Sequence, residues 1–180
     1  GAVVALHTGC IWKEGLNLGD VGVHYGGIMA CTDWFDLLIR GKGSHGAYPQ
    51  DSVDPISIAV QLVGQLQTIV SRELAPLTPA VLTIGELHAG TAFNIIPDEC
   101  RISGTVRALD KETRHFMASR IEEMSKGVVT SMRGEVDFSY GWEGPNPVVN
   151  NPQITQALRD VAEDMLGADR VKELPKPSMV

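Results

Sequence analysis

The hydrophobic periodicity between Thr32 and Tyr140 constrains the fold more than any other feature of this 180-residue chain. In three stretches, apolar and polar residues alternate with a period of two, which is typical of strands with one buried face, and a fourth stretch is rich in Val, Leu, Ile and Thr, which favour strands. Apolar residues spaced three and four apart predict one helix after an N-cap at Asp54 and another after an N-cap at Asp110. The predicted strands are residues 35–40, 80–87, 99–109 and 135–140. This β-α-β-β-α-β order predicts an α+β ferredoxin-like sandwich, with two helices on one face of an antiparallel sheet.

The usual strand order of such a sandwich, 4-1-3-2, makes the second and fourth strands the edges. The fourth carries Glu135 and Asp137, charges that oppose pairing with another chain. The second strand has no charge before Glu86, and an uncharged edge that stays uncovered invites aggregation. We therefore expect a homodimer in which residues 80–87 pair with their own copy across a two-fold axis.

The two ends of the chain predict further elements outside the sandwich. Residues 3–6 form an apolar run that predicts a buried strand ending at His7, and a short strand is expected at residues 21–25. Residues 144–147, Gly-Pro-Asn-Pro, indicate a boundary. A helix begins again after Asn151 as N-cap. Its expected buried stripe is Ile154, Leu158, Val161 and Met165.

Composition limits the classes of function. The net charge of −7 has the wrong sign for binding nucleic acid or an anionic membrane through phosphates. No apolar run reaches the roughly 18 residues that a bilayer span needs, and the first residues lack the pattern of a signal peptide. The three cysteines, Cys10, Cys31 and Cys100, form neither a disulfide framework nor a metal knuckle. We expect a soluble protein of the cytoplasm, a reducing compartment.

Four residues are candidates for chemistry, and each also has an ordinary structural interpretation. His45 lies between glycines in a loop that can present its imidazole, or it is an incidental residue of a flexible turn. The amide of Asn94 could bind a substrate carboxylate or cap a turn. Arg107 belongs to the polar face of a strand, where exposed ion pairing is the default. His7 ends its predicted strand at a place suited to a metal ligand, but one histidine cannot hold a metal alone.

Three motifs, taken in order, resemble the bacterial metallo-amidohydrolases of the hippurate hydrolase and auxin-conjugate hydrolase type, which are relatives of aminoacylase and carboxypeptidase G. The motifs are Gly41-Lys42-Gly43-Ser44-His45-Gly46-Ala47-Tyr48-Pro49 with Val53-Asp54-Pro55, Gly90-Thr91-Ala92-Phe93-Asn94-Ile95-Ile96-Pro97-Asp98-Glu99, and Gly104-Thr105-Val106-Arg107. The resemblance implies cleavage of the amide bond of N-acyl amino acids with a pair of divalent metals, zinc or manganese. It also implies a ferredoxin-like lid that dimerises and interrupts a catalytic domain. On this basis residues 1–30 end one catalytic segment, residues 31–144 form the lid and residues 145–180 begin the second segment.

The resemblance also implies roles for the candidate residues. His45 would reach the active site of the other subunit and polarise the scissile carbonyl, and an imidazolium there would stabilise the oxyanion by roughly 3 to 4 kcal/mol. Asn94 and Arg107 would hold the substrate carboxylate, and His7 would be a metal ligand. Gln50 stands where many relatives have a second histidine, and Cys10 stands where many have proline.

The sequence shows none of the other ligand motifs of such enzymes, nor their glutamate base. We therefore expect a portion of a hydrolase that is inactive alone and binds no metal tightly by itself. One alternative is a non-catalytic ferredoxin-like module that binds a small molecule or only assembles subunits. Another is a naturally truncated pseudoenzyme.

Overall fold

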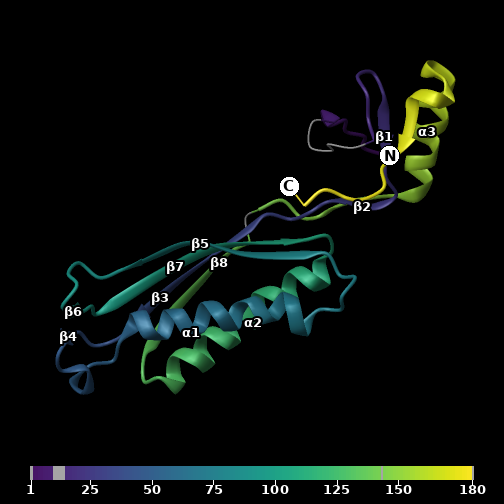
Figure 1. Ribbon diagram of the computed structural model, residues 1–180. Helices are drawn as coiled ribbons and strands as arrows, with labels where there is room; N and C mark the ends of the chain where they lie inside the picture. The colour runs from purple at the N-terminus through teal and green to yellow at the C-terminus, as the bar shows by residue number, and fades with distance from the viewer. Residues whose placement is uncertain (1, 10–14, 143, 180) are drawn as a thin grey trace.

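The computed structural model describes residues 2–9, 15–142 and 144–179, and they form two lobes joined by a narrow waist (Figure 1). The larger lobe, here called the sandwich domain, comprises residues 31–142. The smaller one, the flanking lobe, comprises residues 15–30 and 144–179. Both ends of the chain lie on the side of the flanking lobe (Figure 1).

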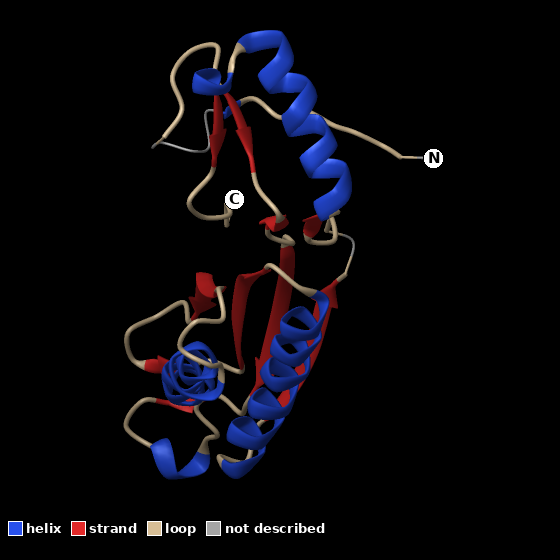
Figure 2. Cartoon of the chain, turned by 90° about the vertical axis from the view of Figure 1, so that its right-hand side faces the viewer, coloured by secondary structure: helices blue, strands red, loops and turns tan. Residues whose placement is uncertain are grey.

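The sandwich domain has the predicted topology. Its elements are β3 (Asp33–Arg40), α1 (Pro55–Thr68), β5 (Ala80–Ala89), β7 (Glu99–Ala108), α2 (Lys111–Ser131) and β8 (Glu135–Gly141). Neighbouring strands are antiparallel and their order is β5-β7-β3-β8, which confirms the 4-1-3-2 arrangement and makes β5 and β8 the edges. Both helices cover one face of this sheet (Figures 1 and 2).

The core lies between the sheet and the two helices. Phe35, Leu37 and Ile39 of β3 are fully buried, and residues of both helices pack against them. The predicted N-caps are confirmed, since the Asp54 side chain accepts from the amides of Ile56 and Ser57 and Asp110 accepts from Thr113. The last turn of the first helix is a π-helical segment, η3 (Ile69–Glu73), which ends before Pro76 as expected.

Short elements form the end of the sandwich domain that lies farthest from the flanking lobe, and we call this end the tip (Figure 1). They are β4 (Ser44–His45), the 3-10 turn η2 (Pro49–Asp51) and β6 (Ile95–Ile96). β4 and β6 pair antiparallel, so the tip joins two loops that are far apart in the sequence.

The flanking lobe consists of two small strand pairs and one long helix. β1 (Val21–Val23) pairs parallel with β10 (Val171–Glu173), and β2 (Gly26–Met29) pairs antiparallel with β9 (Val148–Asn150). Helix α3 (Pro152–Leu166) begins at the predicted N-cap Asn151 and is followed by η4 (Ala168–Arg170). None of the helices in the three described stretches combines the length and the hydropathy that a membrane crossing needs.

Two expectations for the ends are wrong. Residues 3–6 form no strand, and Val3 and Leu6 are 96% and 89% exposed, because no neighbouring strand in the described parts pairs with them. The stripe of α3 is not buried either, since Val161 and Met165 are 57% and 75% exposed and Thr155 is the buried residue of this helix. The helix is amphipathic as predicted, but the β1–β10 strand pair that it contacts covers only part of its apolar face.

Candidate functional site

The tip brings His45 and Asn94 together. In the pairing of β4 with β6, His45 lies opposite Ile95, and the amide of Gly46 donates a hydrogen bond to the carbonyl oxygen of Asn94 at 2.8 Å. Both His45 and Asn94 are exposed. The backbone segments that carry these two residues, from separate motifs, therefore lie side by side at the end of the molecule, where both residues are exposed.

The imidazole of His45 is held by its own turn. Its Nδ1 accepts a hydrogen bond from the Ala47 amide at 3.1 Å, so the neutral ring carries its proton on Nε2 and can donate it outward. The amide of Tyr48 donates to the His45 carbonyl oxygen at 2.8 Å, and the two rings lie 6.0 Å apart. The segment is thus a hydrogen-bonded turn, and it presents the Nε2 side of the ring outward as a hydrogen-bond donor.

Asp98 clamps the base of this turn, a role that sequence reasoning missed. Its Oδ1 accepts from the Gly43 amide at 2.8 Å, and its carbonyl oxygen accepts from Gly41 at 2.7 Å. A side chain at Gly43 would place Cβ 2.7 Å from the carbonyl oxygen of Ile96, so only glycine permits this approach. The signal that could have identified Asp98 is its place directly after Pro97, at the end of the Asn94 motif.

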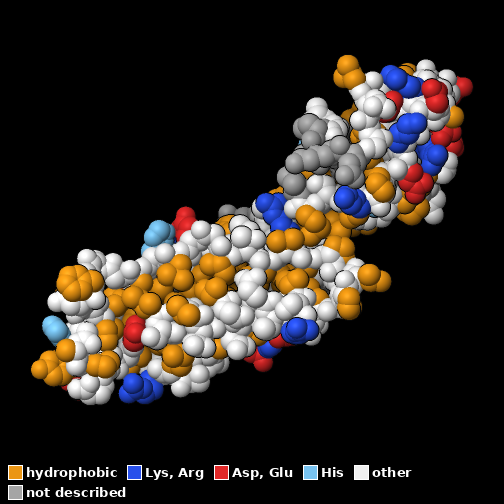
Figure 3. Space-filling model, viewed as in Figure 1, with side chains coloured by type: hydrophobic (Ala, Val, Ile, Leu, Met, Phe, Trp, Pro, Cys, Tyr) orange, Lys and Arg blue, Asp and Glu red, His pale blue; other side chains and the backbone are white. Residues whose placement is uncertain are grey.

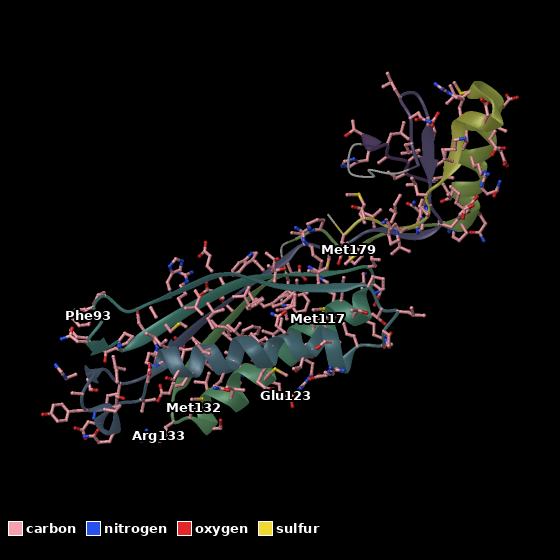
Figure 4. The ribbon with its side chains drawn as sticks, in the orientation of Figure 1. Phe93, Met117, Glu123, Met132, Arg133 and Met179 are labelled. Carbon is pink, nitrogen blue, oxygen red and sulfur yellow. The ribbon has the colours of Figure 1, made fainter. Side chains whose placement is uncertain are left out.

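Apolar side chains surround the polar pair. Tyr48, Phe93 and Ile95 are 58%, 105% and 51% exposed. Phe93 extends from the tip, away from the rest of the chain (Figure 4). Such a cluster of exposed large side chains around two polar ones is typical of a surface that closes over another body.

Arg107 lies at the opposite end of the sandwich domain. It follows Glu99 by eight residues along β7, a distance of about 27 Å at the usual rise of a strand. Its Nη1 donates to the Thr32 hydroxyl at 2.6 Å, and the residue is half-buried. One chain therefore does not bring Arg107 to His45 and Asn94.

The residues described do not fit a complete metal site. His7 is exposed and lies outside any strand, and its Nδ1 is 2.7 Å from the carbonyl oxygen of Thr8. Across the described stretches there is no cluster of three or more His, Cys, Asp or Glu side chains able to hold an ion. An imidazole such as that of His7 can supply one ligand of a metal, whereas a complete site needs three or more protein ligands.

The exposed edge of the sheet continues onto α1. Val81 on β5 is 37% exposed, and on α1 Ile56 and Val60 are 38% and 60% exposed. A Cβ built on Gly90, just beyond β5, would lie 3.7 Å from Cδ1 of Ile56, so strand end and helix meet there. Apolar side chains also run along much of the sandwich domain in Figure 3. The β5 edge and α1 thus both expose apolar side chains.

Known proteins match the chain over most of its length. Residues 32–131 match the model of the peptidase dimerisation domain. The N-acetyl-L-cysteine deacetylase of Bacillus subtilis is 38% identical over 161 residues, which cover 89% of this chain and 38% of that protein. The N-acetyldiaminopimelate deacetylase of Enterococcus faecalis is 40% identical over 151 residues, or 84% of this chain and 39% of that protein. The chain thus spans about two fifths of the length of these relatives.

Solved structures agree. A putative aminohydrolase from methicillin-resistant Staphylococcus aureus superposes with a TM-score of 0.78 at 28% identity, over 89% of this chain and 42% of that one. A dinuclear metal binding peptidase from the M20 family, from Bacillus subtilis, gives a TM-score of 0.71 at 28% identity, over 93% and 41% of the two chains. The resemblance inferred from the three motifs is confirmed at the level of family and fold.

Proposed function

Because the chain belongs to the M20 family of peptidases and amidohydrolases, we propose that it is the dimerisation lid, with adjoining catalytic segments, of a metal-dependent amidohydrolase. The amide bond of an N-acyl amino acid is the proposed target, as the names of the relatives suggest. The observation that carries the proposal is the convergence of His45 and Asn94 at an exposed tip, remote from the flanking lobe of the same chain.

The edge strand supplies a way to complete the site in a dimer. If β5 pairs with its copy across a two-fold axis, the copies run antiparallel, so the start of one strand lies beside the end of the other. Arg107 is the partner of Val81 near the start of β5, whereas the tip lies beyond Ala89 at its end. The tip of one protomer would then approach the Arg107 end of its twin.

In this arrangement each side chain has a chemical task. The Nε2–H of His45 donates to the carbonyl oxygen of the scissile amide and stabilises the charge that develops there. The amide of Asn94 and the guanidinium of Arg107 bind the substrate carboxylate. His7 would contribute one imidazole to a pair of divalent metals, zinc or manganese, which would polarise the amide carbonyl, and the remaining ligands and the general base would come from outside residues 1–180.

Mixed dimers of the full-length protein test whether His45 acts in trans. His45→Ala and His7→Ala homodimers should each lose hydrolysis of N-acetyl-L-cysteine and other N-acetyl amino acids. A one-to-one mixture, after subunit exchange, should regain about a quarter of wild-type activity, since half of the dimers are mixed and each has one intact site. His45→Ala dimers that keep full activity would instead favour a non-catalytic module.

The interface has its own test, in which two valines of similar exposure are compared. Val60→Lys places a charge on the dimer surface of α1, and Val161→Lys places one on α3; the two valines are 60% and 57% exposed. Sedimentation of the 180-residue chain should show a dimer dissociation constant raised at least about tenfold by Val60→Lys, because burying an unpaired charge costs more than 1.4 kcal/mol. Equal effects of the two substitutions would contradict an interface built on β5 and α1.

A further inference from the structure

The waist between the two lobes is an interrupted two-stranded ribbon. The pairing of β3 with β8 reaches Trp34 and Gly141, and pairing resumes between β2 and β9 at Met29 and Val148. Between these points the ladder is broken. The incoming and returning segments nevertheless touch, because a Cβ on Gly144 would lie only 1.5 Å from the carbonyl oxygen of Thr32.

One guanidinium fills the break. Arg114, on α2, donates from Nε and Nη2 to the two carboxylate oxygens of Asp33 at 2.6 and 2.5 Å. Its Nη1 donates to Oδ1 of Asn146 at 2.7 Å, and Nη2 also reaches the carbonyl oxygens of Trp142 and Gly144 at 3.1 and 3.4 Å. A residue of the helix layer therefore binds the incoming segment through Asp33 and the returning segment through three separate groups.

The ion pair at the centre of this cluster is buried and hydrogen-bonded. The Arg114 and Asp33 side chains are 6% and 0% exposed, and the Tyr140 hydroxyl donates to Asp33 at 3.0 Å. The hydrogen bond to Asp33 raises the pKa of Arg114, so the guanidinium stays charged. The ring of Trp142 lies 5.3 Å from the guanidinium carbon and adds a cation–π contact.

We propose that Arg114 is a positioning residue: its guanidinium ties the two segments of the waist together and so sets the angle at which the sandwich domain carries its tip. The guanidinium has several N–H donors in one plane, so it can bind Asp33 and the returning segment at the same time. A lysine could keep the ion pair with Asp33 but could not span both segments. For catalysis this inference rests on the proposed function, because only then must the tip meet a reacting group.

The test compares Arg114→Lys with Arg120→Lys in the full-length protein. Arg120 lies on the same helix, and its ion pairs with Glu73 and Glu123 stay inside the sandwich domain. Spin labels at Gln61 on α1 and Gln153 on α3, both exposed, report the distance between the lobes. Cys31 and Cys100 are buried and so protected from the label, and Cys10 is replaced by serine. Labelled protomers are diluted with unlabelled ones, so that the distances measured lie within one protomer.

Arg114→Lys should broaden the distance distribution, whereas Arg120→Lys should leave it as in the wild type. With N-acetyl-L-cysteine as substrate, kcat should fall by about ten- to a hundredfold, as a misplacement of about 1 Å predicts, with a smaller change in KM. An unchanged distribution would overturn the inference. If Arg114→Lys does not fold, Asn146→Ala, at an exposed residue, removes one link and must broaden the distribution by itself. If Arg114→Lys broadens the distance distribution while His45→Ala keeps full activity, the positioning role of Arg114 is retained and the proposed function is rejected.

Discussion

The two lobes obey the same local rules but differ in what their apolar faces cover. In the sandwich domain, α1 buries Ile58, Leu62 and Leu66 completely against the sheet. In the flanking lobe, α3 starts with an equally good cap but leaves Leu158 and Met165 39% and 75% exposed. Capping and periodicity determine whether a helix forms, whereas burial depends on elements that here are not among the described residues. The flanking lobe therefore leaves much of the apolar face of α3 exposed.

The largest contrast is expected for the ion pairs. Arg114→Met leaves the buried carboxylate of Asp33 without its cationic partner, although the Tyr140 hydroxyl still donates to it, and should lower the free energy of unfolding by about 3–5 kcal/mol. Arg159→Met in α3 breaks the pair with Glu163, whose side chain is 30% exposed, and should cost less than about 1 kcal/mol. Urea unfolding of the 180-residue chain, followed by circular dichroism, measures both values. Similar losses would show that the flanking lobe is as tightly built as the sandwich domain.

The next largest difference in the free energy of unfolding is expected between two leucine-to-alanine substitutions, one in each lobe. Leu62→Ala removes a side chain that is 0% exposed and should lower the free energy of unfolding by about 2–5 kcal/mol. Leu158→Ala, at a residue 39% exposed, should change it by about 0.5 kcal/mol or less. In the full-length protein Leu158→Ala should become clearly destabilising, because other parts of the catalytic domain are proposed to cover α3. If Leu158→Ala stays neutral there as well, α3 remains a surface helix and that proposal is wrong.

These contrasts also show what the sequence could predict. The strands of the sandwich domain were predictable because residues such as Phe35 and Leu37 give a strand one face that must be buried, and their order followed from the usual arrangement of a ferredoxin-like sandwich. The stripe of α3 was identified, but its burial could not be, since periodicity does not reveal whether a covering element exists. The prediction of a buried strand at residues 3–6 was wrong for the same reason.

The site was predictable as single residues but not as an arrangement. His45 and Asn94 stand out in their motifs, whereas their adjacency depends on the pairing of β4 with β6, which two residues per strand do not reveal. Arg114 gave no signal at all. It is one of several polar residues of a helix, and its partner Asp33 is 81 residues away, so only the fold makes it a buried group.

The pH dependence should separate the lobes as well. Burial raises the pKa of the Cys31 and Cys100 thiols, and of the Tyr140 hydroxyl. In the unfolded chain a thiol loses its proton near pH 8.5, while the folded protein keeps it. Stability is therefore complete below about pH 8.5 and falls as the pH rises toward the raised values, by up to about 1.4 kcal/mol per pH unit for each group.

Urea midpoints measured between about pH 7 and 10 test this expectation. The Cys31→Ala and Cys100→Ala double variant should be less stable at pH 7 but should have a flatter dependence, because two of the titrating groups are gone. Helix α3 contains no cysteine, so its own unfolding should show no matching step from a buried thiol, although the Tyr25 hydroxyl donates to Gln156 on this helix at 2.7 Å. An unchanged slope in the double variant would mean that the thiols titrate normally in the fold.

The smallest effect gives the sharpest comparison, because the same kind of substitution is made in both lobes. Asp110 accepts from the Thr113 amide at 2.7 Å, and Asn151 accepts from the Gln153 amide at 3.0 Å. Replacing either cap by alanine should cost its helix about 1 kcal/mol. Since α2 packs on the core, Asp110→Ala should shift the urea midpoint of the sandwich domain. Since α3 does not, Asn151→Ala should leave that midpoint unchanged and raise hydrogen exchange of the α3 amides by about fivefold. A shared midpoint shift for both variants would mean that the lobes unfold as one cooperative unit, and the distinction between them would fail.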